Sequence, residues 1–111
     1  MKLPTIQDWI WVEAMFIQAM IGGISTNFRQ VALSYENKTW VLTITLEKND
    51  DTDQEEASDI VDEFSVYLED IRDKISSAAY VKGHAVIEIS SGRLEFEQEE
   101  NIRVLFRRKE K

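Results

Sequence analysis

Residues 28–36 and 39–47 show a repeat of two, in which every second residue would point to the same face of a strand. A short polar link separates the two stretches. The apolar residues that fall on one side are Val31, Leu33, Tyr35, Trp40, Leu42, Ile44 and Leu46. A repeat of two with β-branched and aromatic residues is typical of strands. The link at 36–38 is short enough for a hairpin. The chain must therefore build a sheet and cover one of its faces.

Two helices are predicted to supply that cover, at residues 6–21 and 54–76. The second shows an apolar stripe at the spacing of one helix face: Ala57, Ile60, Val61, Phe64, Leu68, Ile71 and Ile75. The first, with Thr5 as its N-cap and Gly22–Gly23 at its end, is apolar in almost every direction. Such a helix is either sandwiched within the domain, or it meets a second chain in a homodimer through Trp9, Trp11 and Phe16.

The C-terminal third of the chain returns to strand-like alternation. Residues 80–90 are expected to turn Ala85, Ile87 and Ile89 inward, and residues 102–108 to place Ile102, Val104 and Phe106 on one face. An additional strand at residues 93–97, after a turn at Ser91–Gly92, is an open alternative. The order is then α-β-β-α-β-(β)-β, and short connections favour antiparallel pairing. We expect an α+β fold: one domain over 1–111, with two helices on one face of an antiparallel sheet of four to five strands.

Sequence motifs for catalysis or for a cofactor are weak. The chain has no cysteine, and its one histidine, His84, has no nucleophile pattern around it. The acidic run at residues 49–56 does not fit the spacing of a calcium loop, although two of its carboxylates could hold magnesium. We therefore expect no enzyme, no cofactor and no dedicated metal site.

The charge of the chain bears on its partners and its compartment. A net charge of −8 argues against nucleic acid as a partner, because phosphate binding needs clustered cations. The basic C-terminal end is interpreted as a protected edge strand, with nucleic-acid contact as the alternative; its cations are Arg103, Arg107, Arg108, Lys109 and Lys111. The apolar stretch at 6–21 is too short and too charged for a membrane span or a secretory signal, so the cytoplasm is expected and no membrane.

Residues 47–74 hold 12 acids and three bases, a charge of −9. Like charges three or four residues apart repel one another on a helix, so a face selected only for solubility would mix in more lysine. We interpret this face as a surface for a basic partner, against the alternative of a merely solvated face. The predicted partner-binding residues, called the acidic face below, are Glu55, Asp59, Asp62, Glu63, Val66, Glu69, Asp70 and Asp73.

The chain resembles the small acidic immunity proteins of bacterial polymorphic-toxin and contact-dependent growth inhibition systems. The residues that carry the resemblance are the apolar opening helix leading into residues 20–29 (MIGGISTNFR), the strand around Trp40, and the acidic helix after Asp50. The resemblance covers about the first 75 residues. It implies a cytoplasmic antidote that binds the toxic domain of an effector, often a basic nuclease.

Overall fold

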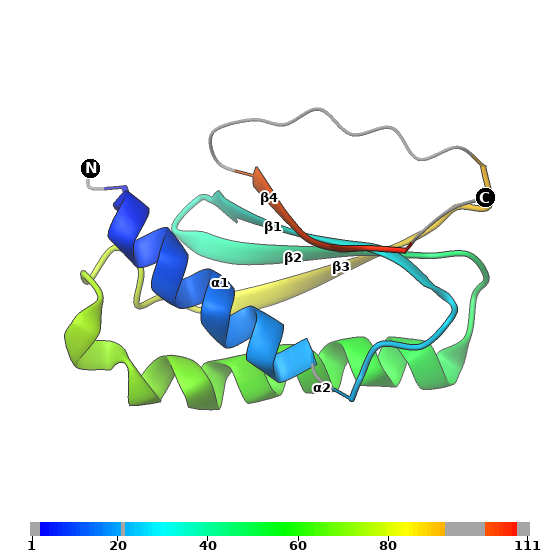
Figure 1. Cartoon of the computed structure of the whole chain (residues 1–111), viewed down its shortest axis with the longest axis horizontal. Coiled ribbons are helices and arrows are strands. Elements are labelled where there is room, and N and C mark those ends of the chain that lie inside the picture. Colours follow the sequence, from blue (N-terminus) through cyan, green and yellow to red (C-terminus); the bar gives the residue numbers. More distant parts are fainter. Residues whose placement is uncertain (1–2, 21, 93–101, 109–111) are drawn as a thin grey trace.

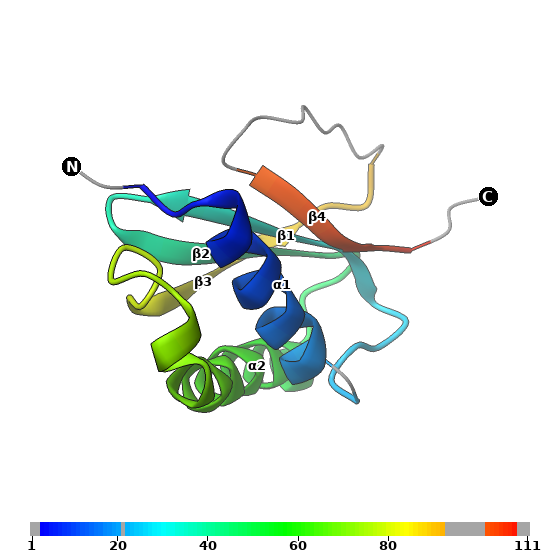
Figure 2. The ribbon, with the colours of Figure 1, turned by 60° about the vertical axis from the view of Figure 1, so that its left-hand side comes forward.

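The computed structural model describes residues 3–20, 22–92 and 102–108. Within them the chain forms two helices and a four-stranded mixed sheet, which confirms the α+β class. The elements are α1 (Ile6–Met20), β1 (Phe28–Glu36), β2 (Thr39–Leu46), α2 (Asp51–Asp70), a short 3₁₀ turn η1 (Arg72–Lys74), β3 (Gly83–Ile89) and β4 (Ile102–Arg107). Both helices lie on the same face of the sheet (Figures 1 and 2). The additional strand considered at 93–97 lies outside the described residues.

The sheet has the strand order β3-β2-β1-β4, and one pairing differs from the prediction. β1 pairs antiparallel with β2 and with β4, but β3 runs parallel to β2. The purely antiparallel sheet was therefore wrong. The reason is α2, because a 20-residue helix spans about 30 Å and carries the chain back to the end of the sheet where β2 begins.

The hairpin of β1 and β2 forms the centre of the sheet. Asn37 and Lys38 both have positive φ, of 49° and 60°, which gives the tight two-residue turn that suits the twist of a hairpin. β1 pairs with β2 in a register that sets Leu33 opposite Leu42 and Tyr35 opposite Trp40. The face predicted to point inward is buried on both strands.

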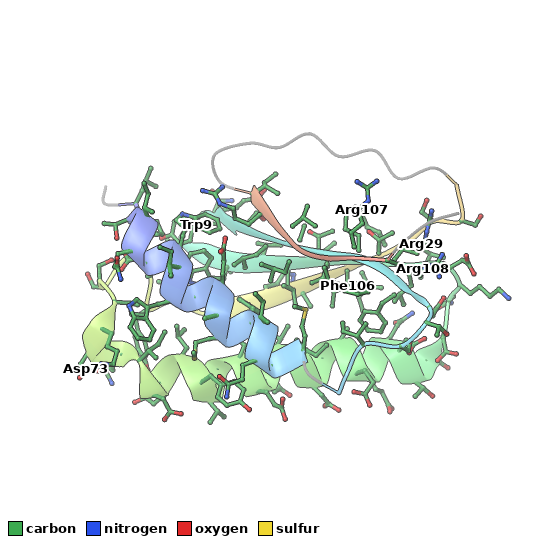
Figure 3. All side chains as sticks on the ribbon, viewed as in Figure 1. Trp9, Arg29, Asp73, Phe106, Arg107 and Arg108 are labelled. Carbon is green, nitrogen blue, oxygen red and sulfur yellow. The ribbon has the colours of Figure 1, made fainter. Side chains whose placement is uncertain are left out.

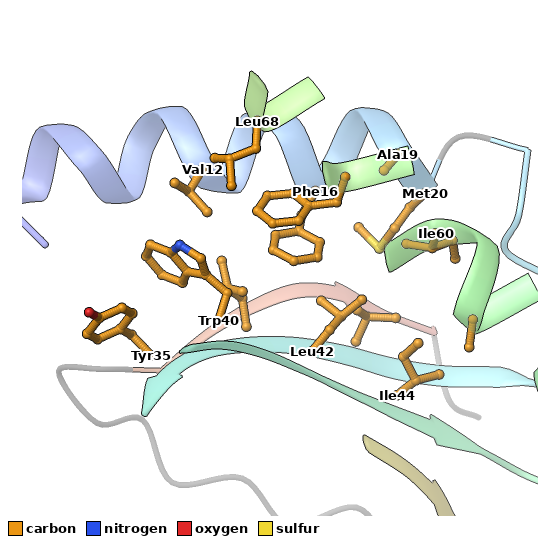
Figure 4. Packing of buried hydrophobic residues seen from close by; sticks show 14 of the residues in the cluster. Val12, Phe16, Ala19, Met20, Tyr35, Trp40, Leu42, Ile44, Ile60 and Leu68 are labelled. Carbon is orange, nitrogen blue, oxygen red and sulfur yellow. The ribbon is translucent and has the colours of Figure 1, made fainter. Parts of the chain in front are cut away.

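The core lies between this hairpin and the two helices (Figure 4). The rings of Phe16 from α1 and Phe64 from α2 stack with centroids 3.6 Å apart. Trp9 meets the edge of Trp40 at 5.0 Å, and the Trp40 indole N–H donates to the Ala79 carbonyl oxygen at 2.8 Å. The aromatic side chains therefore tie both helices and the connection after α2 to the central strand.

One side of α1 is buried within the domain, as the sandwiched interpretation predicts, whereas its other side is exposed to solvent. Trp9 and Phe16 are buried in the core, so they cannot form the homodimer contact proposed for them. Trp11 is half-buried against the same core. On the opposite side Ile6, Ile10 and Ile17 are exposed, Ile6 by 78%.

One predicted detail of the later strands needs correction, and a second holds only in part. β4 carries one extra residue, Leu105, between the partners of Val31 and Ala32. This bulge breaks the alternation, so Ile102 and Val104 do not share a face with Phe106. β3 is an edge strand: Ile89 is on the inward face, in register with Leu46, but at the end of the strand it is 47% exposed.

The helix boundaries follow from capping. Thr5 and Asp8 cap α1 reciprocally: the Asp8 N–H donates to the Thr5 hydroxyl oxygen at 3.1 Å, and the Thr5 N–H donates to the Asp8 carboxylate at 3.0 Å. Gly22, at φ 86°, supplies the left-handed turn after α1. α2 begins three residues earlier than predicted because Asp50 is its N-cap, accepting from the Asp53 N–H at 3.1 Å.

Candidate functional site

The acidic face forms because α2 uses its apolar stripe to cover the sheet. Ala57, Ile60, Phe64 and Leu68 point into the core, which turns the intervening carboxylates outward. Every residue of the acidic face is exposed; seven lie on α2, and Asp73 lies on η1. Figure 3 shows oxygen-tipped side chains along the side of α2 that faces away from the sheet. The structure thus brings the eight predicted residues to one side of the molecule.

Few cations neutralise this face. Within the part of the chain that the structure describes, Glu69 is the one acid of the face with an ion pair or a side-chain hydrogen bond: it pairs with Arg72 at 3.5 Å and accepts from the Tyr80 hydroxyl. Arg72 also lies over the Tyr80 ring, and Lys74 lies over the Trp11 ring, 5.5 Å from its centroid. Both nearby cations are therefore held at the C-terminal end, and the carboxylates from Glu55 to Glu63 face solvent without an ion pair among those residues.

One apolar side chain stands among these charges. Val66 is 64% exposed, and its neighbour Tyr67 is half-buried at the margin of the face. An exposed apolar side chain loses its contact with water when a partner covers it, and that burial contributes to affinity. The face can therefore offer both long-range attraction and a small apolar contact.

Other acids of the segment serve the fold instead. Asp53 is buried and accepts from the Ser25 hydroxyl at 2.8 Å and from the Asn27 side-chain amide at 2.9 Å, which fastens the loop after α1 to the start of α2. Asp50 is the N-cap. Among residues 3–20, 22–92 and 102–108, no group of three or more acids or histidines is placed to hold a metal ion. The carboxylates considered for magnesium in the run at 49–56 include these two structural acids.

Asp8 is a buried acid whose full role the sequence did not reveal. It is 3% exposed and accepts hydrogen bonds from the Ser76 N–H and hydroxyl as well as from Thr5. Burial alone would raise the pKa of this carboxyl, but the hydrogen bonds from Ser76 and Thr5 outweigh it and hold the pKa below its ordinary value. Only the Thr5-x-x-Asp8 spacing was visible in the sequence, and Ser76 is 68 residues away.

A groove beside the acidic face was not foreseen. It has a volume of about 670 Å³ and lies between the first half of α2 and β3. Its lining comprises Asp51, Gln54, Glu55, Ser58, Asp59 and Ile87. Glu55 and Asp59 thus belong to the acidic face and to the groove together. The groove exists because β3 returns beside α2, and no local sequence signal reports that placement.

The remaining candidate residues lie elsewhere. His84 is exposed on β3, on the face of the sheet that points away from the helices. β4 is an edge strand, as predicted for the basic end. Arg108 pairs with Glu47 at 3.0 Å, while Arg103 pairs with Glu13 at 3.6 Å beneath α1. Lys109 and Lys111 lie outside the described residues.

A two-layer α+β chain with a row of exposed carboxylates along one helix has the features expected of a protein that binds a partner. Comparison with protein families gives a match over residues 7–110 to the MafI2 immunity protein family. The chain belongs to this family, whose members are immunity proteins of polymorphic toxin (Maf) systems. It neutralises a cognate toxin and is not an enzyme.

A search among individual curated proteins gave no match. In the described residues no helix is both long and apolar enough to cross a membrane.

Proposed function

We propose that the acidic face binds a basic surface of the cognate toxin, and that the toxic domain is a nuclease whose active-site cleft this face covers. Carboxylates in a row on a helix present negative charge at intervals, as nucleic-acid phosphates do. Bound in the cleft, they exclude the substrate. The observation that carries the proposal is the set of exposed acids from Glu55 to Glu63 that have no ion pair among the described residues.

The charge distribution supports a fast encounter with a cationic partner. Acids line the outer side of α2, whereas Arg29, Arg107 and Arg108 gather at one end of the sheet (Figure 3). A surface of one sign steers an oppositely charged protein toward it and raises the association rate, while an apolar contact that becomes buried on binding, as at Val66, slows release. We place this encounter in the cytoplasm, with residues 1–111 acting as a single domain, in a system related to contact-dependent growth inhibition.

The test reverses charge on the face. We expect the triple variant Asp59→Lys/Asp62→Lys/Asp70→Lys to lose protection of cells that express the toxin domain. Its association rate at low salt should fall at least about tenfold, because steering depends on the sign of the surface. Normal protection by the triple variant, with normal toxin affinity, would show that α2 is the wrong surface.

A matched control distinguishes the effect of charge on the acidic face from the effect of the net charge of the protein. Glu36→Lys reverses one exposed acid away from the acidic face, and Asp62→Lys reverses one within it. Both variants change the net charge equally. Only the second should weaken binding strongly. Equal effects of the two would mean that net charge alone, and not the acidic face, governs association.

Self-association through α1 is the alternative function, and the exposed side chains of Ile6, Ile10 and Ile17 favour it. The homodimer contact would then be formed by these three isoleucines, since Trp9 and Phe16 are buried in the core. Sedimentation over a range of concentrations tests it: a dimer that Ile10→Lys dissociates supports the alternative, and a persistent monomer excludes it.

A further inference from the structure

β3 forms one edge of the sheet and leaves backbone groups available for pairing. β3 pairs with β2 on one side, and among the described residues no strand lies along its other side. At its two ends the Trp40 N–H donates to the Lys82 carbonyl at 3.1 Å, and the Ser90 N–H donates to the Leu46 carbonyl at 2.9 Å. Backbone groups of successive strand residues point to opposite sides. The even-numbered residues of β3 therefore bond to β2, whereas Ala85, Ile87 and Ile89 direct their N–H and C=O groups outward.

The groove lies directly beside this edge. Near Gly83 the strand and α2 touch, since a Cβ on Gly83 would lie 3.2 Å from the Phe64 ring. Toward the end of β3 the two elements diverge, and the groove opens between Ile87 and the first half of α2. α2 and β3 run alongside each other in opposite directions (Figure 1). An extended chain laid against β3 would therefore have α2 along one side.

The acids of the groove have a spacing that suits such a chain. Asp51, Glu55 and Asp59 are four residues apart, about 6 Å along the helix axis per step. Alternate side chains of an extended strand repeat at about 6.6 Å. A strand with lysine or arginine at every second position would thus place successive cations opposite successive carboxylates.

We propose that an extended segment of the toxin, with basic side chains at alternate positions, pairs with the free edge of β3 as a fifth strand and sets those side chains into the groove against α2. The inference rests on the proposed function for the nature of its partner, and it adds the mode of binding. Backbone hydrogen bonds supply affinity in this mode, and the alternate side chains supply specificity.

The charges near the two edges of the sheet favour β3 over β4 as the binding edge, and a basic segment over a second copy of this chain as the partner. The other edge of the sheet, β4, carries Arg103 and Arg107 and contains no acid, so it offers a basic segment no row of carboxylates. A second copy of this chain paired through β3 would bring two rows of α2 carboxylates together. The edge of β3 therefore suits a cationic strand and disfavours self-pairing.

Amide hydrogen exchange by NMR tests the proposal on the wild-type protein. In the free protein the amides of His84, Val86 and Glu88 should exchange slowly, and those of Ala85, Ile87 and Ile89 quickly. On binding the purified cognate toxin domain, in an inactivated form, the three odd-numbered amides should slow at least about tenfold. A complex that forms while these amides keep their free rates overturns strand pairing and leaves the acidic-face proposal standing. Absence of any complex overturns both.

A matched pair of variants gives a second readout. Ile87→Pro removes one outward N–H and leaves the bonds to β2 in place, whereas Ile87→Ala shortens the side chain and keeps the N–H. We expect the proline variant to bind the toxin domain at least tenfold more weakly than the alanine variant. Equal affinities, with both variants folded by their chemical shifts, contradict the proposal; if the proline variant does not fold, the exchange pattern of the wild type decides.

Discussion

The carboxylates of Asp8 and Asp53, near the starts of the two helices, are buried, whereas the carboxylates on the outer face of α2 are exposed to solvent. Asp8 and Asp53 each accept hydrogen bonds from residues distant in the sequence. The acids of the acidic face are exposed, and most have no ion pair among the described residues. A count of carboxylates therefore overstates the charge available to a partner. The difference separates the acids that the fold needs from those left for binding.

The largest effect is expected at Asp8. Asp8→Ala leaves the Ser76 N–H and hydroxyl without their acceptor and removes half of the α1 cap. Since hydrogen bonds to a charged group are strong, the free energy of unfolding should fall by about 3 kcal/mol, measured by urea denaturation. Asp62→Ala, the control on the acidic face, should change it by less than about 0.5 kcal/mol. Similar losses in the two variants would abolish the distinction between the two groups of acids.

The pH dependence gives a separate check on Asp8. Its folded-state pKa lies below the ordinary value of 3.8, so the ionised carboxylate stabilises the fold. That stabilisation is complete above the unfolded-state pKa and is lost as the pH falls through the folded-state pKa. The difference in unfolding free energy between wild type and Asp8→Asn should therefore shrink as the pH is lowered below about 4. A difference that stays constant over this range would contradict the assignment.

Asp53 should give the next largest effect. Asp53→Ala removes the acceptor of the Ser25 hydroxyl and of the Asn27 amide, so the loop after α1 loses its attachment to α2. We expect a loss of about 2 kcal/mol in unfolding free energy. Asp51→Ala is the matched control, because Asp51 lies in the same first turn but is exposed. A loss as large for Asp51 would indicate a general charge effect at the helix start.

The distinction between the two groups of acids was only partly predictable. Strong local periodicity predicted the hairpin, both helices and the side of α2 that faces solvent. The partners of Asp8 and Asp53 were not predictable, because Ser76 and Ser25 reach them only after the chain has folded. The parallel pairing of β3, the bulge at Leu105 and the groove have the same origin: each depends on how distant segments meet.

On the acidic face itself, removing charge should stabilise the protein. Asp59 and Asp62 are three residues apart on α2 without a cation between them. Asp59→Asn/Asp62→Asn should raise the melting temperature at low salt, corresponding to a few tenths of a kcal/mol, and the gain should fade at high salt. Glu69→Gln should show no such gain, because Glu69 pairs with Arg72. Destabilisation by the double variant would mean that these acids serve the fold after all.

A similarly small effect is expected at Glu13, which is intermediate between the two groups. It is half-buried on α1, and burial raises its pKa above the ordinary value of 4.5 although Arg103, 3.6 Å away, lowers it in part. The charged form is therefore disfavoured in the folded state, and Glu13→Gln should raise the unfolding free energy at pH 7 by no more than about 0.5 kcal/mol.

The pH profile of Glu13 should run opposite to that of Asp8. With a folded-state pKa above the unfolded one, the contribution of Glu13 to stability increases as the pH falls through the folded-state pKa, and Glu13→Gln should remove that increase. Urea denaturation of wild type and variant from neutral pH down to about pH 4 measures it. A clear loss of stability for Glu13→Gln at pH 7 would show that the Arg103 pair outweighs burial, and would place Glu13 with the acids that the fold needs.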